Sequence, residues 1–214
     1  MKITEEMRIK KAHVALMKHP ETALYTGIFL MGKSTIDDKT PTAYTDGWNK
    51  IYGREFVKKQ SDRELRGLIM HENLHVALNH MSRFYKEFKK DPRLVNASAD
   101  YVVNDIIVNF KDKDHCLLPE GALLDSKYHN WSLNEVYRDM KQQRDKDPDF
   151  EPEDSMDEHG FGEGESADMT PEKAEQMSKE IDQKLREGAI LAGKLGGSTP
   201  KQIRELLDGV VDWK

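Results

Sequence analysis

The sequence contains little cysteine, no long apolar run and no excess of basic residues. Its single cysteine, Cys116, excludes a disulfide framework and fits a reducing cytoplasm. No run of about 18 apolar residues is present to span a membrane, and the charged first twenty positions are unlike a signal peptide. Lys and Arg number 33 against 39 Asp and Glu, whereas phosphate binding favours a basic surface. We therefore expect a cytoplasmic protein that binds neither membranes nor nucleic acid.

The chain is long enough for one sizeable domain and an appendage. Of its 214 residues, 37% are hydrophobic and 34% are charged, which predicts a soluble protein with a modest core. Residues 145–169 are acidic, contain Gly and Pro, and have too few apolar side chains to offset the entropy of ordering them. The composition thus predicts a domain over residues 1–144, a disordered linker over 145–169 and a C-terminal helical segment over 170–214.

Apolar periodicity and capping signals predict a mostly helical chain with a small sheet. Segment 22–31, TALYTGIFLM, is rich in β-branched, aromatic and aliphatic residues, and we predict a buried strand there. In segment 41–53, Asp46 and Gly47 favour the type I′ turn of a hairpin. Helices are expected at about residues 4–18, 62–89, 93–110, 133–145 and 171–194, with a short one after Pro200.

The stretch HENLH, residues 71–75, lies on the longest predicted helix. His71 and His75 are four residues apart and share a helix face. Both imidazoles can therefore bind one metal ion at roughly 2.0–2.1 Å, the usual distance from zinc to nitrogen. Glu72 lies about 100° around the helix from His71, where it can act on a metal-activated water without being a ligand. This spacing indicates a zinc site with Glu72 as the general base of a hydrolase.

The HExxH motif has an alternative interpretation as a polar helix face with two solvated histidines. Random shuffling of this composition gives the motif in roughly one chain in forty, so the motif alone is not specific. Two observations favour the metal site. The surrounding sequence LIMHENLHVAL is apolar, and buried imidazoles and carboxylates need partners. Ser61 and Glu64 also form a capping box at the start of the helix, as a rigid ligand platform requires.

A catalytic zinc usually has three protein ligands, and two residues compete for the third position. Asn96, Asp100 and Asn104 form a polar stripe on an otherwise apolar predicted helix. If the stripe faces the HExxH helix, Asp100 is the third ligand and the two asparagines orient the ligands; a solvated helix face is the alternative. His80 follows His75 by five residues, about 140° around a straight helix. Because VALN between them contains no Gly or Pro, we predict a continuous helix and favour Asp100 over His80.

Four segments in order resemble the metallopeptidase domain of bacterial and phage proteins, which often precedes a von Willebrand A-like domain. The resemblance covers residues 8–140 and implies a zincin-like α+β fold, with the small sheet beside the HExxH helix, and one Zn²⁺ per chain. His159 resembles a histidine of the family's linker, which implies an additional or removable metal ligand or else a solvated loop histidine. The second domain is not among the 214 residues. The segments are PTAYTDGWNKIYG, LRGLIMHENLHVALNHMSR, LVNASADYVVN and LLPEGALLDSKYHNWSLNEVY.

These residues and this resemblance together predict a zinc-dependent metallopeptidase that hydrolyses peptide bonds in protein or peptide substrates, in the host cytoplasm if it is phage-encoded. In proteins similar to zincins, an edge strand pairs with the extended substrate, and TAYTDG and WNKIYG are the candidates here. The alternative is a non-catalytic zinc-stabilised binding module, such as a phage protein acting on a host component. Glu72 favours the enzyme, since a structural zinc needs no general base. A zinc hydrolase of non-peptide bonds would use the same ligands.

Overall fold

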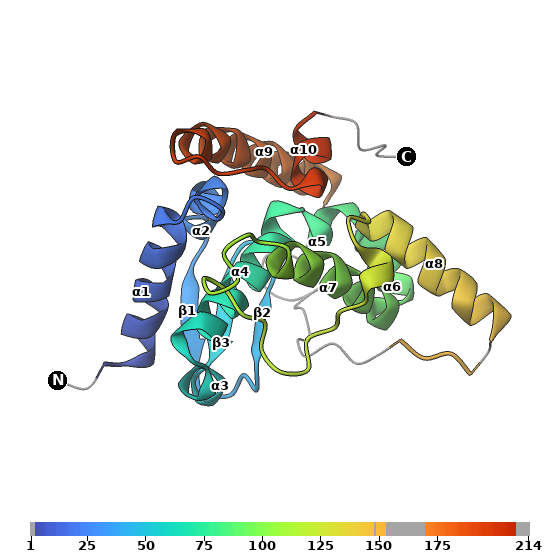
Figure 1. Ribbon diagram of the computed structural model, residues 1–214. Coiled ribbons are helices and arrows are strands. Elements are labelled where there is room, and N and C mark those ends of the chain that lie inside the picture. Colours follow the sequence, from blue (N-terminus) through green and yellow to red (C-terminus); the bar gives the residue numbers. More distant parts are fainter. Residues whose placement is uncertain (1–2, 148, 153–169, 209–214) are drawn as a thin grey trace.

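The computed structural model describes residues 3–147, 149–152 and 170–208. Within them, helices surround a three-stranded sheet, which confirms the mostly helical α+β class (Figure 1). The strands are β1 (Ser34–Asp37), β2 (Ala43–Thr45) and β3 (Lys50–Gly53). The helices are α1 (Glu5–Lys18), η1 (Ala23–Tyr25), α2 (Thr26–Phe29), α3 (Arg54–Lys59), α4 (Asp62–Ala77), α5 (His80–Arg83), α6 (Tyr85–Lys90), α7 (Pro92–Val108), η2 (Ser126–Tyr128), α8 (Leu133–Lys146), α9 (Pro171–Lys194) and α10 (Lys201–Leu207).

The sheet has the strand order β1-β3-β2, so that β3 is its central strand. The predicted hairpin is present, since β2 and β3 pair antiparallel, while β1 pairs parallel with β3. The predicted type I′ turn is wrong. Such a turn needs a positive φ at both central residues, and here Gly47 has a φ of 90° whereas Asp46 has a negative one. The carboxylate of Asp46 instead accepts the backbone N–H groups of Trp48 at 2.9 Å and Asn49 at 2.7 Å. A side chain thus closes the turn, as Asp commonly does.

The segment predicted as a buried strand, residues 22–31, is helical and forms η1 and α2. The predicted burial is correct, since Leu24, Tyr25 and Ile28 have no exposed surface. The predicted strand is wrong because an apolar run by itself does not distinguish a buried strand from a buried helix. Here α9 covers the segment, and its backbone touches that of η1. An ideal Cβ on Gly188 would lie 1.8 Å from the carbonyl oxygen of Leu24, so only glycine fits there.

The long helix predicted through residue 89 is interrupted after α4. Its start is as predicted, with Ser61 and Glu64 forming a capping box. Asn79, however, is left-handed, with φ of 54° and ψ of 39°, and α5 starts in a new direction at His80. Asparagine tolerates this conformation better than most residues and commonly follows a helix end. The prediction of a continuous helix between His75 and His80 is therefore wrong. It rested on the lack of Gly and Pro in this stretch, whereas the helix ends at an asparagine.

Helix α4 lies at the centre of the molecule, in contact with α1, α7 and β2. Every residue from Leu68 to Ala77 is buried, as the apolar surroundings of the motif predicted. The ends of α1, α7, α8 and α9 agree with the predictions to within two residues, whereas α3 and η2 were not predicted. Ser132 and Glu135 form a second capping box at α8, and Thr170 caps α9. The fold therefore places the HExxH motif in the core, between a helix layer and the sheet.

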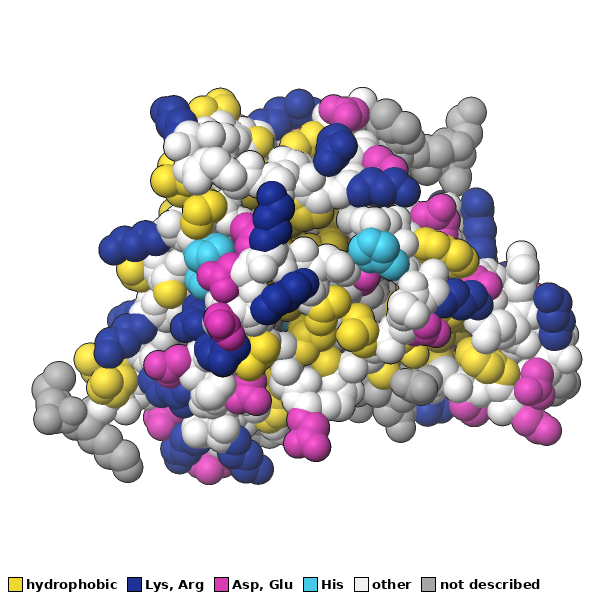
Figure 2. Space-filling model, viewed as in Figure 1, with side chains coloured by type: hydrophobic (Ala, Val, Ile, Leu, Met, Phe, Trp, Pro, Cys, Tyr) yellow, Lys and Arg dark blue, Asp and Glu magenta, His cyan; other side chains and the backbone are white. Residues whose placement is uncertain are grey.

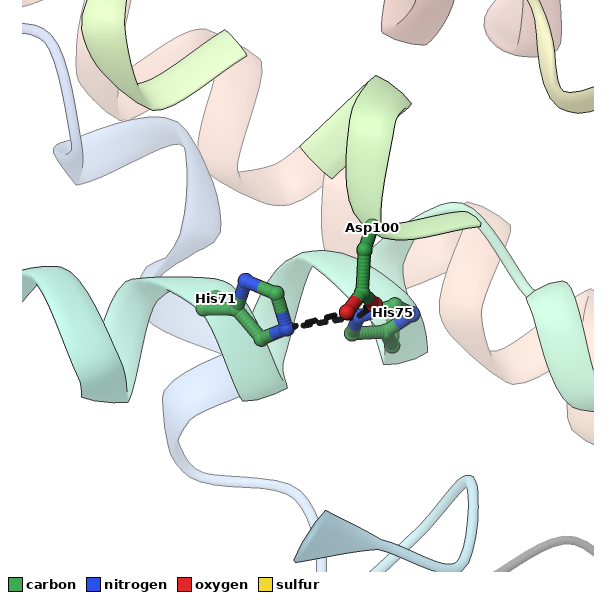
Figure 3. Close-up of side chains that lie close together, drawn as sticks. All are labelled: His71, His75 and Asp100. Atoms are coloured by element: carbon green, nitrogen blue, oxygen red, sulfur yellow. Dashed lines mark hydrogen bonds and ion pairs between the residues drawn. The ribbon is translucent and has the colours of Figure 1, made fainter. Parts of the chain in front are cut away.

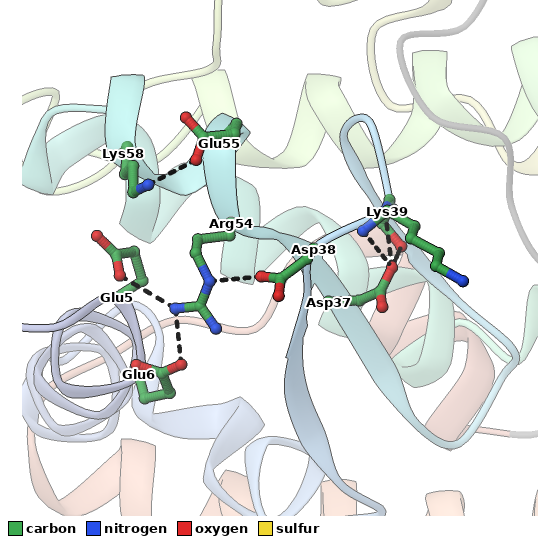
Figure 4. Close-up of polar contacts among 9 residues, drawn as sticks. Glu5, Glu6, Asp37, Asp38, Lys39, Arg54, Glu55 and Lys58 are labelled. Carbon is green, nitrogen blue, oxygen red and sulfur yellow. Dashed lines mark hydrogen bonds and ion pairs between the residues drawn. The ribbon is translucent and has the colours of Figure 1, made fainter.

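Arg54, the first residue of α3, connects the N-terminal helix to the sheet (Figure 4). Its Nη1 atom lies 3.1 Å from Glu5 and 2.9 Å from Glu6, and its Nε atom lies 2.6 Å from Asp38. One guanidinium group thus holds the first turn of α1 beside the residue that follows β1. These pairs lie near the surface and are screened by salt.

The surface carries charges of both signs. On the face shown in Figure 2, Lys and Arg side chains are interspersed with Asp and Glu rather than gathered into one basic patch. This distribution agrees with the formal net charge of −6. Among the helices of the described residues, none is long and apolar enough to cross a membrane.

Candidate metal centre

Two helices that cross in the core supply three side chains that converge on one point (Figure 3). Helix α4 supplies His71 and His75, and α7 supplies Asp100. The two Nε2 atoms lie 3.0 Å apart. The Oδ1 atom of Asp100 lies 3.6 Å from Nε2 of His71 and 3.3 Å from Nε2 of His75. In the described part of the chain, this is the one group of at least three such side chains whose ligand atoms converge closely enough to hold a metal ion.

The triangle formed by these atoms fits a tetrahedral metal site. Ligand atoms bound at roughly 2.0–2.1 Å in tetrahedral geometry lie about 3.3–3.4 Å from one another. The observed separations of 3.0, 3.3 and 3.6 Å bracket this value. A tetrahedron has a fourth vertex, so that three protein ligands leave one position for a water molecule or a substrate oxygen. The residues present therefore fit a four-coordinate metal site.

The orientation of His71 is fixed by a relay of two hydrogen bonds. Its Nδ1 atom lies 2.8 Å from Oδ1 of Asn104, and Nδ2 of Asn104 donates to the carbonyl oxygen of Leu123 at 2.9 Å. Because the amide nitrogen faces Leu123, the amide oxygen must face His71 and accept its Nδ1–H. Neutral His71 then carries its lone pair on Nε2, the atom that points at the triangle. The predicted role of Asn104 in orienting a ligand agrees with this contact.

The other ring nitrogen of His75 contacts His80. The two Nδ1 atoms lie 3.1 Å apart, with the ring centroids separated by 5.2 Å. The prediction that His80 points away from the site is wrong, because the turn at Asn79 brings it back. His80 nevertheless does not join the three converging ligand atoms. It contacts the side of the His75 ring opposite to the metal position.

The charge balance of the triangle favours a bound cation. His71, His75 and Asp100 are 4%, 1% and 2% exposed, so that bulk water stabilises them little. Once Nδ1 of His71 donates to Asn104, its Nε2 atom is a lone-pair donor that faces a second imidazole and a carboxylate oxygen. Electron-rich atoms this close together in a buried site repel one another unless a proton or a metal ion lies among them.

A family model described as "Putative metallopeptidase domain" matches residues 4–214. The chain belongs to the putative metallopeptidase domain family. No curated protein and no solved structure was found to match it. The family assignment agrees with the resemblance noted in the sequence. The match also covers α9 and α10, beyond the segments that carried that resemblance.

In this family member, Glu72 is adjacent in sequence to the ligand His71 and is fully buried, with 0% exposure. It follows His71 on α4 and is not one of the three converging groups. The carboxylate of Glu72 interacts electrostatically with Lys50 on β3, which is also fully buried. Burial lowers the pKa of Lys50 to about 7, while Asp46 and Glu72 act in the opposite direction. The ammonium group of Lys50 is held by the carbonyl oxygens of Ile28 at 3.1 Å and Met31 at 2.8 Å. No pattern in the sequence indicated this buried lysine.

The other predicted site residues lie apart from the triangle or outside the described residues. Asn96 is half-buried one turn before Asp100, and its Oδ1 atom has no hydrogen-bond partner among the described residues. The predicted role of Asn96 therefore stays a prediction. His159 lies outside the described residues. Cys116 is buried, and burial raises the pKa of its thiol to about 12, which agrees with a small buried side chain rather than a nucleophile.

Strand β2 is an edge of the sheet and packs against α4. Of the two predicted edge segments, WNKIYG forms the central strand β3, which leaves β2 as the edge next to the metal centre. The backbone N–H of Gly53 donates to the carbonyl of Thr42 at 2.7 Å, just before β2. Because backbone groups alternate between the two sides of a strand, the N–H and C=O groups of Ala43 and Thr45 point away from β3.

Proposed function

We propose that this domain is a zinc-dependent peptidase in which His71, His75 and Asp100 hold one Zn²⁺ and Glu72 is the general base. The observation that carries the proposal is the triangle of ligand atoms, whose 3.0, 3.3 and 3.6 Å sides suit tetrahedral coordination with one open position. Two imidazoles and one carboxylate are a ligand set found in hydrolytic zinc enzymes. The ion would supply Lewis-acid polarisation of the attacking water and of the scissile carbonyl.

In this proposal, the residues around the metal ligands have separate tasks. Asn104 holds His71 in the tautomer that presents Nε2, through the 2.8 Å contact described above. Glu72 takes a proton from the attacking water and delivers it to the leaving amine. Strand β2 is an edge strand, but Ala43 and Thr45 are 1% and 0% exposed, so an extended peptide could pair with this edge only after the residues that cover it have moved. The family description, a putative metallopeptidase domain, is what makes a peptide or protein the best-suited class of substrate.

Cleavage of a complex peptide library tests this proposal and does not require that the substrate be known. The zinc-loaded protein is incubated with a proteome-derived peptide mixture, and new termini are identified by mass spectrometry. Glu72→Gln is the matched control, because the amide is nearly isosteric but does not accept the proton. Since a general base contributes about 10²–10⁴-fold, we expect cleavage to fall by at least that lower factor while the zinc content stays the same. Equal cleavage by both proteins would rule out Glu72 as the base.

The burial of the site favours a second candidate, a metal-stabilised binding module without catalysis. Glu72 and His75 are 0% and 1% exposed, and closed sites are typical of structural zinc. The same library experiment separates the two candidates. A binding module would contain zinc and lose stability on chelation, yet would produce no new termini with either protein. The presence of Glu72 next to the ligands is the reason that we favour the enzyme.

A further inference from the structure

The turn at Asn79 returns the chain to the metal centre after α4 has ended. In a continuous helix, His80 would lie about 140° around the axis from His75. The left-handed residue Asn79 instead starts α5 at His80, and the Nδ1 atoms of the two histidines come within 3.1 Å. Both rings are almost wholly buried, with exposures of 1% for His75 and 2% for His80. A contact between two buried ring nitrogens needs one shared proton, because two lone pairs or two N–H groups would repel each other.

We propose that His80 is a positioning residue that sets the tautomer and the ring orientation of His75; this inference rests on the metal site proposed above. Two arrangements of the shared proton exist. If Nδ1 of His80 donates, the single ring N–H of neutral His75 is on Nε2, and His75 cannot bind a metal through that atom. If Nδ1 of His75 donates, its Nε2 atom carries a lone pair and points at the triangle. Metal binding selects the second arrangement, in which His80 is the acceptor.

The two histidine ligands are thus oriented by chemically different groups. Asn104 fixes His71 through an amide whose orientation is itself held by the Leu123 carbonyl at 2.9 Å. His80 fixes His75 through an imidazole that must keep its Nδ1 lone pair and therefore carries its proton on Nε2. His80 also lines a groove of about 880 Å³ whose walls come mainly from α5, α6, α8, α9 and α10. The ring of His80 therefore lies between the groove and the His75 ligand.

Three substitutions at His80 test this role in the full-length protein. His80→Asn retains an acceptor, because Oδ1 of asparagine is bonded to Cγ, as Nδ1 of histidine is. His80→Leu fills a similar space without an acceptor, and His80→Ala replaces it if the leucine variant does not fold. The zinc dissociation constant is measured by competition with a chromogenic chelator, and the absorption spectrum of the Co²⁺ form reports the coordination. His13→Leu on α1 is the control, since His13 is a largely buried histidine that contacts the carbonyl of Ile9.

We expect His80→Leu and His80→Ala to weaken zinc binding by about 10–100-fold, the usual effect of losing such a contact. His80→Asn and His13→Leu should stay within a few-fold of the original affinity, with an unchanged Co²⁺ spectrum. Wild-type affinity in His80→Leu would overturn the positioning role. Equal losses in the asparagine and leucine variants would also overturn it, and an altered Co²⁺ spectrum would then identify His80 as a ligand. If the unsubstituted protein binds no metal, the proposed function fails first, which distinguishes the two failures.

Discussion

Replacing Gly188 with alanine should destabilise the protein, although alanine is the better helix former. Gly188 lies in the C-terminal half of α9, where an added Cβ would be 1.8 Å from the Leu24 carbonyl oxygen. Carbon and oxygen atoms of neighbouring backbones normally approach to about 3.3 Å, so that α9 would have to withdraw by about 1.5 Å. The withdrawal would loosen the packing of three buried side chains of α9, Ile181, Leu185 and Ala192.

The expected change in the free energy of unfolding combines two opposing effects. Overpacking costs about 1–3 kcal/mol, and the upper end applies because the obstructing atom is a backbone carbonyl rather than a flexible side chain. The gain in helix propensity offsets about 1 kcal/mol of this. Gly188→Ala should therefore lose about 2 kcal/mol. Gly193→Ala is the control on the same helix, because its Cβ would meet nothing within 4 Å. It should gain up to about 1 kcal/mol.

Urea unfolding followed by circular dichroism measures both changes, with free energies obtained by linear extrapolation. The difference of about 3 kcal/mol between the two variants is larger than the error of the method. Equal stabilisation by both alanines would refute the contact between α9 and η1. It would then favour the sequence-based prediction that residues 170–214 form a segment separate from residues 1–144. A single cooperative transition with the expected difference would instead place α9 in the same folding unit as the metal centre.

Three further outcomes are expected. Asn79→Ala should lower the free energy of unfolding by about 1 kcal/mol, because alanine disfavours the left-handed conformation. Asn79→Gly should not lower it, and equal urea midpoints for the two variants would contradict this expectation. Because burial lowers the pKa of Lys50 to about 7, the folded protein releases this proton while the unfolded chain keeps it. The metal-free protein should therefore gain stability between about pH 7 and pH 9, and Lys50→Met should remove part of that slope. Asp100→Ala should weaken zinc binding by orders of magnitude in chelator competition, and near-normal affinity would exclude it as a ligand.

The convergence of His71, His75 and Asp100 could be predicted because it depends on helical periodicity. Residues four apart share a face, and a polar stripe on an apolar helix needs a polar counterpart on the helix that it crosses. The contact of His80 could not be predicted in the same way. It depends on one left-handed residue, Asn79, whose identity permits the turn without requiring it.

Other features depend on contacts between distant parts of the chain. The amide of Asn104 is oriented by the carbonyl of Leu123, which lies in an irregular segment and carries no side-chain signal. Residues 22–31 are helical, where a strand was predicted, and α9, which covers them, begins 140 positions after residue 31. Local composition describes how apolar a segment is, whereas the partner that covers it decides between helix and strand.

Metal analysis of the purified protein tests the central claim most directly. After incubation with zinc and removal of the excess, elemental analysis should find one zinc ion per chain in the unsubstituted protein. The double variant His71→Ala/His75→Ala should bind none, since it retains only one of the three converging ligands. A metal-free unsubstituted protein, or full zinc occupancy in the double variant, would contradict the account.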